Sequence, residues 1–408
     1  MISPDQLDAE IAKYHEQIKQ FIHDLIRFNT TNEDKTSHLP IEDSIIHRII
    51  QECANLKLPY TVYEQEPGRP NLYVGKKENF EKKEGLLFIS HADTVPVGDI
   101  QTWHHNPYNA IEEDGKLYGI GTMDCKSGIA LSLYTLKILF NLGITSAKAI
   151  IGVDEESGAD KRYGLAYTLD QGLDANSAIY TYGGRPNEII IGHRGLLRYW
   201  LKVNGEAQHT GLIKGNAATG VNAIEYLIKA IDEVNKITMP DKPNKYFPKY
   251  KFRQTATMVT GGVGESIVPP SAEVLYDVRL MPGQDPEEYL SKVRELIVTL
   301  DKKNPEVTME VKVKNHFPAA LISEDEPIVQ ILKKILIDEQ IEPVMKGAGP
   351  ANEGYMFIHK GIPTICGYGV SGGRFHQPDE YMELDSIDPT IKRYIQCAAA
   401  INENSIDK

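Results

Sequence analysis

Three apolar segments between Gly85 and Ser157 each end in polar side chains that can bind a metal. The segments end in His91 and Asp93, in Asp124, and in the DEE run at 154–156. Buried strands with polar groups at their carboxyl ends are how open α/β sheets build active sites. One imidazole with several carboxylates suits a divalent cation such as zinc. The pattern therefore predicts an α/β sheet with a metal site at one edge.

The composition is that of an ordinary globular protein, with 41% hydrophobic and 25% charged residues in a chain of 408, long enough for two domains. The formal net charge of −13 argues against nucleic acid or an anionic membrane as the main partner. The four cysteines form no CxxC pair, which favours reduced thiols in a cytoplasmic protein. We find no signal-peptide core and no apolar run near the ~20 residues needed to cross a bilayer.

Helical and strand-like patterns alternate over residues 1–193, which predicts a doubly wound, mostly parallel sheet with helices on both faces. The segment after Asp124 is a strong helix, and Gly143 stands where a C′ glycine belongs. The expected helices are 4–27, 40–56, 127–143 and 165–171, and the expected strands are 61–64, 71–74, 86–90, 147–153, 178–182 and 188–192.

The pattern changes near Arg194, where LRYWLKVNG alternates apolar and polar residues as a half-exposed strand does. Two helices, 219–237 and 286–300, are interspersed with three further strand-like segments: TATMVTGG, SAEVLYDVRLMP and EVTMEVKVKNHF. We therefore expect a smaller α+β domain with an antiparallel sheet, inserted over residues 194–313. The doubly wound pattern resumes over 314–408, with a helix at 327–337, a strand in GIPTICGYG and a C-terminal helix from about Pro389.

Each candidate site residue has an alternative explanation. His91 and Asp93 face the same way at a strand end, so the carboxylate can orient the imidazole of a metal ligand. They could equally be a surface pair. Asp124 follows a glycine-rich turn and could bridge two metals, or could be the N-cap of the next helix.

The run Asp154-Glu155-Glu156 follows a buried strand, where adjacent carboxylates repel one another unless a positive charge compensates them. One glutamate could bind a metal while its neighbour stays free as a base, and the alternative is an exposed acidic turn. His376 follows another apolar strand in SGGRFHQPDE; most loop histidines have no such role.

Taken together, these segments resemble the M20 family of metallopeptidases and deacylases. This group includes acetylornithine deacetylase, succinyl-diaminopimelate desuccinylase, aminoacylase-1 and glutamate carboxypeptidase. The similar blocks are HADTVPVGD, YGIGTMDCKSG, DEESG, HRGLLRYWLKVNGEAQHTG, VPPSAEVLYDVRLMP and FHQPDE, in the family's order and spread over about residues 15 to 400.

The resemblance implies one or two zinc ions, with cobalt or manganese as possible substitutes. His91 and Asp124 would hold one ion, and Asp124 would bridge to another held by Glu156 and His376. Asp93 would orient His91, and Glu155 would be the general base.

The resemblance also assigns roles outside the metal site. His209, on the inserted domain, would stabilise the oxyanion, commonly across the interface of a homodimer. Arg279 would grip a substrate carboxylate, a bidentate task suited to guanidinium. The segment GAGPANEG stands where relatives usually carry a Ser-Asp pair. Asn352 and Glu353 would substitute for that pair, and Asn352 would contact the substrate.

One departure from the family concerns the ion beside His91. Relatives complete its ligands with an Asp or Glu some way after the ligand glutamate, but no carboxylate stands between Ser177 and Asn187 here. Tyr182 or Gly183 takes that place, and Asp174 lies slightly too early. That ion could be weakly held, could be bound by Asp174 after a local shift, or could be absent.

The resemblance therefore implies a zinc-dependent hydrolase that cleaves the amide bond of an N-acyl amino acid, with a metal-activated water and Glu155 as general base. A di- or tripeptidase or carboxypeptidase of the same family is the alternative. A further alternative is a non-hydrolytic binding relative with an incomplete metal site.

Overall fold

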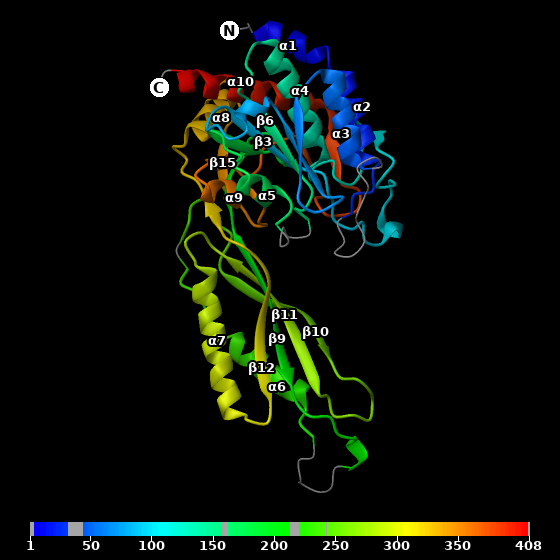
Figure 1. Ribbon diagram of the computed structural model, residues 1–408, viewed down its shortest axis with the longest axis vertical. Coiled ribbons are helices and arrows are strands. Elements are labelled where there is room, and N and C mark those ends of the chain that lie inside the picture. Colours follow the sequence, from blue (N-terminus) through cyan, green and yellow to red (C-terminus); the bar gives the residue numbers. More distant parts are fainter. Residues whose placement is uncertain (1–3, 32–43, 157–161, 213–219, 242, 407–408) are drawn as a thin grey trace. The chain divides into compact units, whose positions relative to one another are not determined.

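The computed structural model describes residues 4–31, 44–156, 162–212, 220–241 and 243–406. The chain forms two compact units (Figure 1). The first comprises 1–192, 321–347 and 352–408, and the second comprises 193–320 with 348–351. The second unit is therefore an insertion in the sequence of the first. Within the described ranges, no helix is both long and apolar enough to span a membrane.

The first unit is built on a six-stranded sheet with the order β1-β2-β6-β3-β7-β15. Strands β6, β3, β7 and β15 are mutually parallel, whereas β2 runs antiparallel to both of its neighbours. Every residue of β3 is buried, as its continuous apolar sequence predicts for a strand covered on both faces. The strand bounds are β1 Tyr60–Glu64, β2 Pro70–Val74, β3 Leu86–His91, β6 Lys148–Gly152, β7 Ser177–Tyr180 and β15 Thr364–Ile365.

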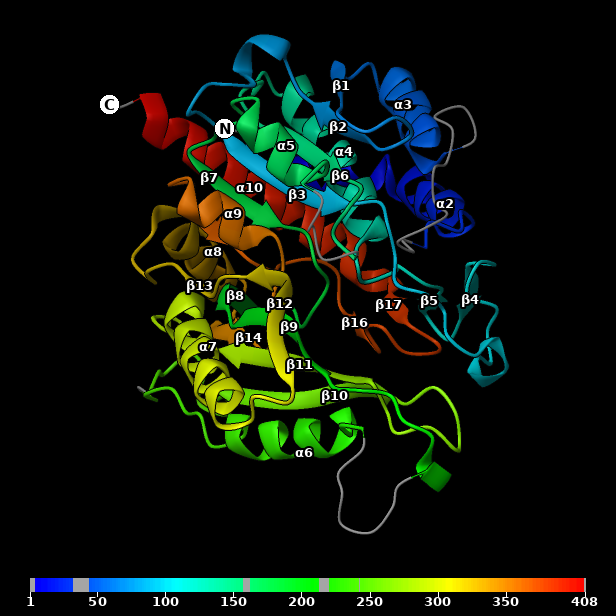
Figure 2. The same cartoon turned by 60° about the horizontal axis from the view of Figure 1, so that its bottom comes forward.

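Helices cover both faces of this sheet, which confirms the expected α/β class. Helices α4 and α10 pack against β3 and against each other, while α5 contacts β6 and α9 contacts β15 (Figure 2). Helix α4 is buried along nearly its whole length, and Gly143 follows it with a left-handed φ of 81°. The helix bounds are α1 Pro4–Ala12, α2 His15–Ile26, α3 Ile45–Leu56, α4 Lys126–Asn141, α5 Leu165–Asp170, α8 Pro327–Asp338, α9 Gly354–His359 and α10 Ile387–Ile406.

Two expectations about this unit were wrong in detail. The single helix expected at 4–27 is two helices, because the chain turns at Tyr14, whose N–H bonds to the Ile11 carbonyl oxygen. The strand expected at 188–192 is β8 Glu188–His193, but it pairs in a separate three-stranded sheet, β13-β8-β14. Its partners are β13 Ala320–Leu321 and β14 Val344–Ala348. The expected helix start at 40–43 lies outside the described residues.

The sequence reading missed a small antiparallel sheet with the order β16-β17-β5-β4. Its strands are β4 Ile111–Glu113, β5 Lys116–Tyr118, β16 Gly372–Gly373 and β17 Tyr381–Glu383. Asp114 and Gly115, between β4 and β5, have φ of 50° and 75°. An Asp-Gly pair in this conformation is a standard hairpin signal, so the first hairpin was detectable. Short 3-10 turns occur at η2 Lys77–Asn79, η3 Ile100–Thr102, η4 Thr210–Leu212 and η5 Leu384–Ser386.

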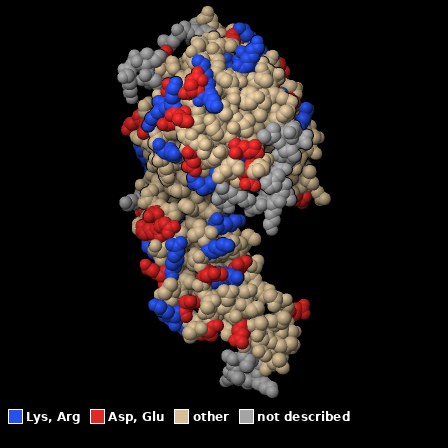
Figure 3. Space-filling model, viewed as in Figure 1, with Lys and Arg blue, Asp and Glu red and all other residues tan. Residues whose placement is uncertain are grey.

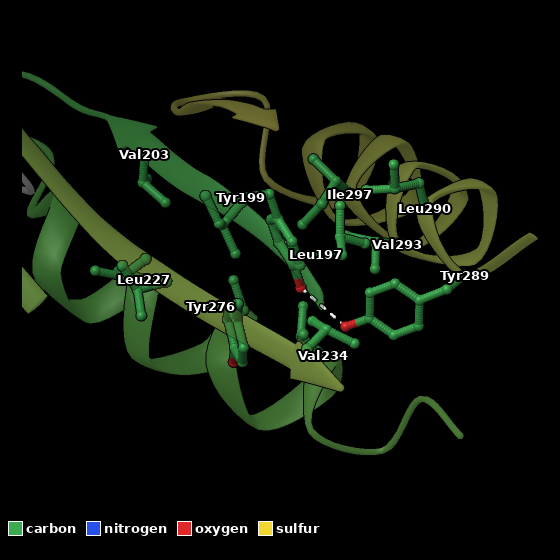
Figure 4. Close-up of a cluster of buried hydrophobic side chains, with 14 of the residues drawn as sticks. Leu197, Tyr199, Val203, Leu227, Val234, Tyr276, Tyr289, Leu290, Val293 and Ile297 are labelled. Carbon is green, nitrogen blue, oxygen red and sulfur yellow. Dashed lines mark hydrogen bonds between the residues drawn. The ribbon is translucent and has the colours of Figure 1, made fainter. Parts of the chain in front are cut away.

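The second unit is a four-stranded antiparallel sheet, β10-β11-β9-β12, with two helices packed against it. Alternate residues of β9 and β11 point inward, where Tyr199 stacks on Tyr276 and its hydroxyl lies 3.1 Å from that of Tyr289 (Figure 4). Acidic and basic side chains are mixed over the face that carries α7 (Figure 3). The elements are β9 Gly195–Asn204, α6 Ala223–Val234, β10 Arg253–Gly261, β11 Ser271–Leu280, α7 Pro286–Lys303 and β12 Thr308–Phe317.

Candidate metal centre and active site

The parallel pairing of β3 with β6 brings the first and third sequence motifs together. His91 lies beside Gly152 in the ladder, and the Ala92 N–H bonds to the Gly152 carbonyl oxygen at 2.8 Å. The DEE run therefore leaves β6 at the level of His91. An all-apolar strand followed by polar residues places charged side chains at one sheet edge.

A tight turn before α4 delivers Asp124 to the same edge. The buried carboxylate of Glu380 accepts the backbone N–H of Met123 at 2.8 Å and that of Asp124 at 3.3 Å. The N-cap position of α4 belongs to Cys125, which makes no side-chain capping bond. The N-cap alternative for Asp124 is therefore wrong.

The carboxylate of Asp124 lies between two histidines. Its Oδ1 is 2.8 Å from His91 Nε2, and its Oδ2 is 3.0 Å from His376 Nε2. His376 Nε2 also lies 3.2 Å from Glu156 Oε1. Asp124, Glu156 and His376 thus form a group whose ligand atoms are all within 4.8 Å of one another.

His376 reaches this group from the loop between β16 and β17, with a left-handed φ of 53°. This conformation is uncommon for a residue with a side chain, and such strain is concentrated at functional sites. The structure therefore brings His376 from the far end of the sequence to Asp124 and Glu156.

Asp93 organises both the histidine and the glutamates. His91 Nδ1 lies 3.0 Å from the Asp93 carbonyl oxygen, an acceptor, so Nδ1 carries a proton and donates it. The Asp93 carboxylate is 3.4 Å from Nδ1 and accepts the N–H of Glu156 at 2.9 Å and of Glu155 at 3.4 Å. Both the main-chain oxygen of Asp93 and the carboxylate that the sequence predicted therefore face the imidazole.

The charges of this cluster depend strongly on one another. Burial disfavours ionisation of Asp124, but hydrogen bonds from His376 and His91 bring its pKa down to about 2. Hydrogen bonds to Asp124 and Glu156 raise the pKa of His376 to about 11. A positive charge is therefore favoured at the position where the carboxylates meet His376, and a divalent cation can supply it. Imidazole and carboxylate donors in this arrangement fit such a cation.

Glu155 is a further carboxyl group at this edge. It is almost completely buried, and burial, followed by repulsion from Glu156, raises its pKa well above the ordinary range. Burial and the charge of Asp124 raise the pKa of Glu156 in the same direction. Glu155 is therefore a buried carboxyl group with a raised pKa, and it lies near His91 and Glu156.

The other predicted residues occupy different surroundings. His209 and Arg279 belong to the second unit. His209 is exposed, and its Nδ1 accepts the Gly211 N–H. Arg279 on β11 binds both carboxylate oxygens of Asp277, at 2.7 and 3.2 Å.

Asn352 is buried, and both the nitrogen and the oxygen of its side-chain amide form hydrogen bonds with backbone groups. Its Nδ2 donates to the Cys366 carbonyl oxygen at 2.6 Å, and its Oδ1 accepts the Gly354 N–H at 2.9 Å. These bonds fix the turn before α9, so the structure supports a structural role for Asn352 in place of the expected substrate contact.

Asp174 is not available as the replacement ligand considered above. It precedes β7, whose first residue, Ser177, pairs with Leu86 at the start of β3. Because β3 and β7 are parallel, Asp174 lies at the opposite end of the sheet from His91.

Glu380 is a site residue to which the sequence assigned no role, whereas Glu353 was expected, with Asn352, to replace the Ser-Asp pair of relatives. Glu380 belongs to the same FHQPDE block as His376, which was the available signal. Glu353 is fully buried, accepts the Tyr180 hydroxyl at 3.3 Å through Oε2, and has no hydrogen-bond partner for Oε1 among the described residues. The complete burial of Glu353 was not foreseen from the local sequence, because it depends on α9 packing against β15.

Glu353 makes the stability of the protein depend on pH. Burial, and then the nearby carboxylates of Asp154 and Asp93, raise its pKa from 4.5 to about 8. Between these two pH values the unfolded chain releases the proton and the folded protein keeps it. The free energy of unfolding therefore falls with rising pH, by up to about 1.4 kcal/mol per unit.

We expect Glu353→Gln to remove this contribution. The variant should gain stability relative to the wild type as the pH rises from 5 to 8, measured by urea unfolding at both values. A constant difference between the two proteins across this range would contradict the prediction.

Comparisons with known proteins identify relatives of the whole chain. The model of peptidase family M20/M25/M40 matches residues 87–400. Acetylornithine deacetylase of Aliivibrio salmonicida is 26% identical over 386 residues, covering 92% of this chain and 96% of the relative. An uncharacterized metallohydrolase of Methanocaldococcus jannaschii is 27% identical over 348 residues, covering 78% and 81%.

Two solved structures share the fold at 20% sequence identity. A tripeptidase from Staphylococcus aureus has a TM-score of 0.73 and covers 95% of this chain and 99% of its own. An M20 family metallo-carboxypeptidase from Sulfolobus solfataricus has a TM-score of 0.72 with the same coverage. The chain therefore belongs to peptidase family M20/M25/M40, and it is an enzyme of the metallopeptidase and amidohydrolase type.

Proposed function

We propose that this enzyme hydrolyses the amide bond of an N-acyl amino acid, using a divalent metal, zinc in the first instance. Asp124, Glu156 and His376 would hold the ion, and Glu155 would be the general base. The observation that carries the proposal is the position of Glu155, a buried carboxyl group directly beside a compact group of three metal-binding side chains.

A divalent cation in this site would supply Lewis-acid chemistry, lowering the pKa of water and polarising the substrate carbonyl. Glu155 would accept the proton of the attacking water and deliver it to the nitrogen of the leaving amine. Burial and repulsion from Glu156 raise the pKa of Glu155, which makes its carboxylate a stronger base than an exposed one. Asp93 holds Glu155 in place through its backbone N–H.

For the substrate we keep the roles that the family resemblance implies. Arg279 would bind the carboxylate of the amino acid, and His209 would stabilise the oxyanion. Asp277 is shared between Arg279 and Arg198, which lies 3.0 Å away, so two guanidinium groups face one carboxylate. This excess of positive charge favours a substrate anion at that position.

A substrate panel tests the proposed reaction. The zinc-loaded enzyme should release amino acids from N-acetyl or N-succinyl derivatives faster than it cleaves di- and tripeptides. The relative named acetylornithine deacetylase supports the first class. The reverse preference would establish the peptidase alternative, and turnover of neither class would contradict both proposed substrate classes.

We also propose that the enzyme is a cytoplasmic homodimer that pairs through β10. This strand is at one edge of its sheet and exposes Met258 and Val259, at 53% and 62%. The opposite edge, β12, carries Glu310 and Lys312, which discourage strand pairing. The four buried, free cysteines support a reducing location.

Light scattering tests the homodimer. The wild type should have the mass of a dimer, and Val259→Lys should shift it toward the monomer, whereas Glu310→Lys on β12 should not. A monomeric wild type would contradict the proposal.

A further inference from the structure

The strand register identifies the residues beside His91. On one side β6 places Gly152 next to it. On the other side Tyr180, the last residue of β7, pairs with Ile89, and the following Thr181 N–H still bonds to the Ile89 carbonyl oxygen at 2.9 Å. The chain therefore continues along β3 and brings Tyr182 level with His91.

Two tyrosine rings therefore lie on this side of His91. The ring centroids of His91 and Tyr182 are 5.7 Å apart, and Tyr180 stacks on Tyr182 at 4.7 Å. The Gly183 N–H bonds to the Met123 carbonyl oxygen at 3.0 Å, which fixes the backbone beyond the second tyrosine. The position next to His91 that could have carried a metal-binding carboxylate thus carries a phenol.

The centre offers two possible cation positions, one at His376 and one at His91, and they differ in the ligands available. Asp124, Glu156 and His376 give one cation three different ligand side chains, the number that catalytic zinc sites use. In the part of the chain that the structure describes, the side chains grouped with His91 besides Asp124 are the thiol of Cys125, Glu156, which already belongs to the first group, and Glu155, the proposed base. The Cys125 Sγ accepts the His91 backbone N–H at 3.1 Å, so it is engaged with the main chain of β3.

We propose that each chain binds a single divalent cation, held by Asp124, Glu156 and His376. His91 is then a positioning residue. Both of its ring nitrogens face oxygen acceptors, so it is an imidazolium that donates Nδ1–H to the Asp93 carbonyl oxygen and Nε2–H to Oδ1 of Asp124, leaving Oδ2 for the ion. This inference rests on the proposed metal-dependent function and specifies its stoichiometry. It departs from the second ion that the family resemblance implies at His91, because Tyr182 stands in place of a ligand.

Metal analysis by mass spectrometry tests the stoichiometry without measuring activity. Wild-type protein saturated with zinc and then desalted without chelator should contain one ion per chain. Two ions would overturn this inference and leave the proposed hydrolase intact. No bound ion would overturn the proposed metal-dependent function itself.

Variants of the two histidines test which residue is the ligand. His376→Asn should abolish binding, whereas His91→Asn should keep one ion with an affinity about 10- to 100-fold lower, as for residues that orient ligands. A chelator competition titration measures both. Loss of the ion from His91→Asn but not from His376→Asn would overturn the assignment.

Tyr182 offers the converse experiment. Tyr182→Asp places a carboxylate beside His91 and should raise the stoichiometry from one ion to two, whereas Tyr182→Phe should leave it at one. If Tyr182→Asp folds but still binds one ion, the absence of a carboxylate at position 182 is not what prevents binding of a second ion, and this explanation is wrong.

Discussion

Replacing Glu155 by Gln should reduce kcat by about 10²- to 10⁴-fold while the metal stays bound. The amide has nearly the shape of the carboxyl group but cannot accept the proton of the attacking water. Glu155 lies beside the group of Asp124, Glu156 and His376 and is not needed to complete it, so the affinity for zinc should change little. Steady-state kinetics and metal analysis of the same preparation measure both quantities.

A surface glutamate provides the matched control. Glu113→Gln, at the exposed end of β4, should have the activity of the wild type. Near-native turnover in Glu155→Gln with full metal content would contradict the role of general base. If the metal were lost along with activity, Glu155 would be a ligand and another group would move the proton.

Asp124→Asn should have the second large effect, the loss of both the metal and the activity. Asp124 contacts His91 and His376 with separate oxygens, and an amide presents one oxygen and one NH₂ group in their place. The uncharged side chain also removes the charge that balances a cation. Zinc at 100 times its Kd should stabilise the wild type by about 2.7 kcal/mol, but it should not stabilise the variant.

Thermal unfolding with zinc and with chelator measures this difference. Asp174→Asn is the control, because Asp174 lies at the opposite end of the sheet and should keep the zinc-dependent stabilisation. A wild-type response to zinc in Asp124→Asn would show that the ion binds elsewhere.

The sequence was most informative where one local pattern determined one element. The apolar run 86–90 predicted β3, and the run after Asp124 predicted α4 with its terminal glycine. The change from continuous to alternating hydrophobicity at Arg194 marked β9, in the second sheet. These features depend on burial of one strand face or both, which the side-chain pattern records directly.

Sequence reasoning was weaker where an element depends on its partner. Strand β8 contains a continuous apolar run like those of the core strands, yet it pairs with β13 and β14 outside the main sheet. Asn352 was expected to contact the substrate, but its amide bonds to Cys366 and Gly354. Pairing and packing of distant segments decided both cases.

The sequence by itself determined the family, the α/β class and the set of residues able to bind a metal, because each lies in a recognisable local motif. Only the tertiary structure decided which of these residues contact one another. It placed Asp124 between two histidines, used the Asp93 carboxylate to hold the glutamates, and set Tyr182 beside His91. The physical reason is that the register of parallel strands and the closure of loops distant in sequence fix which side chains meet, and no local pattern encodes these distances.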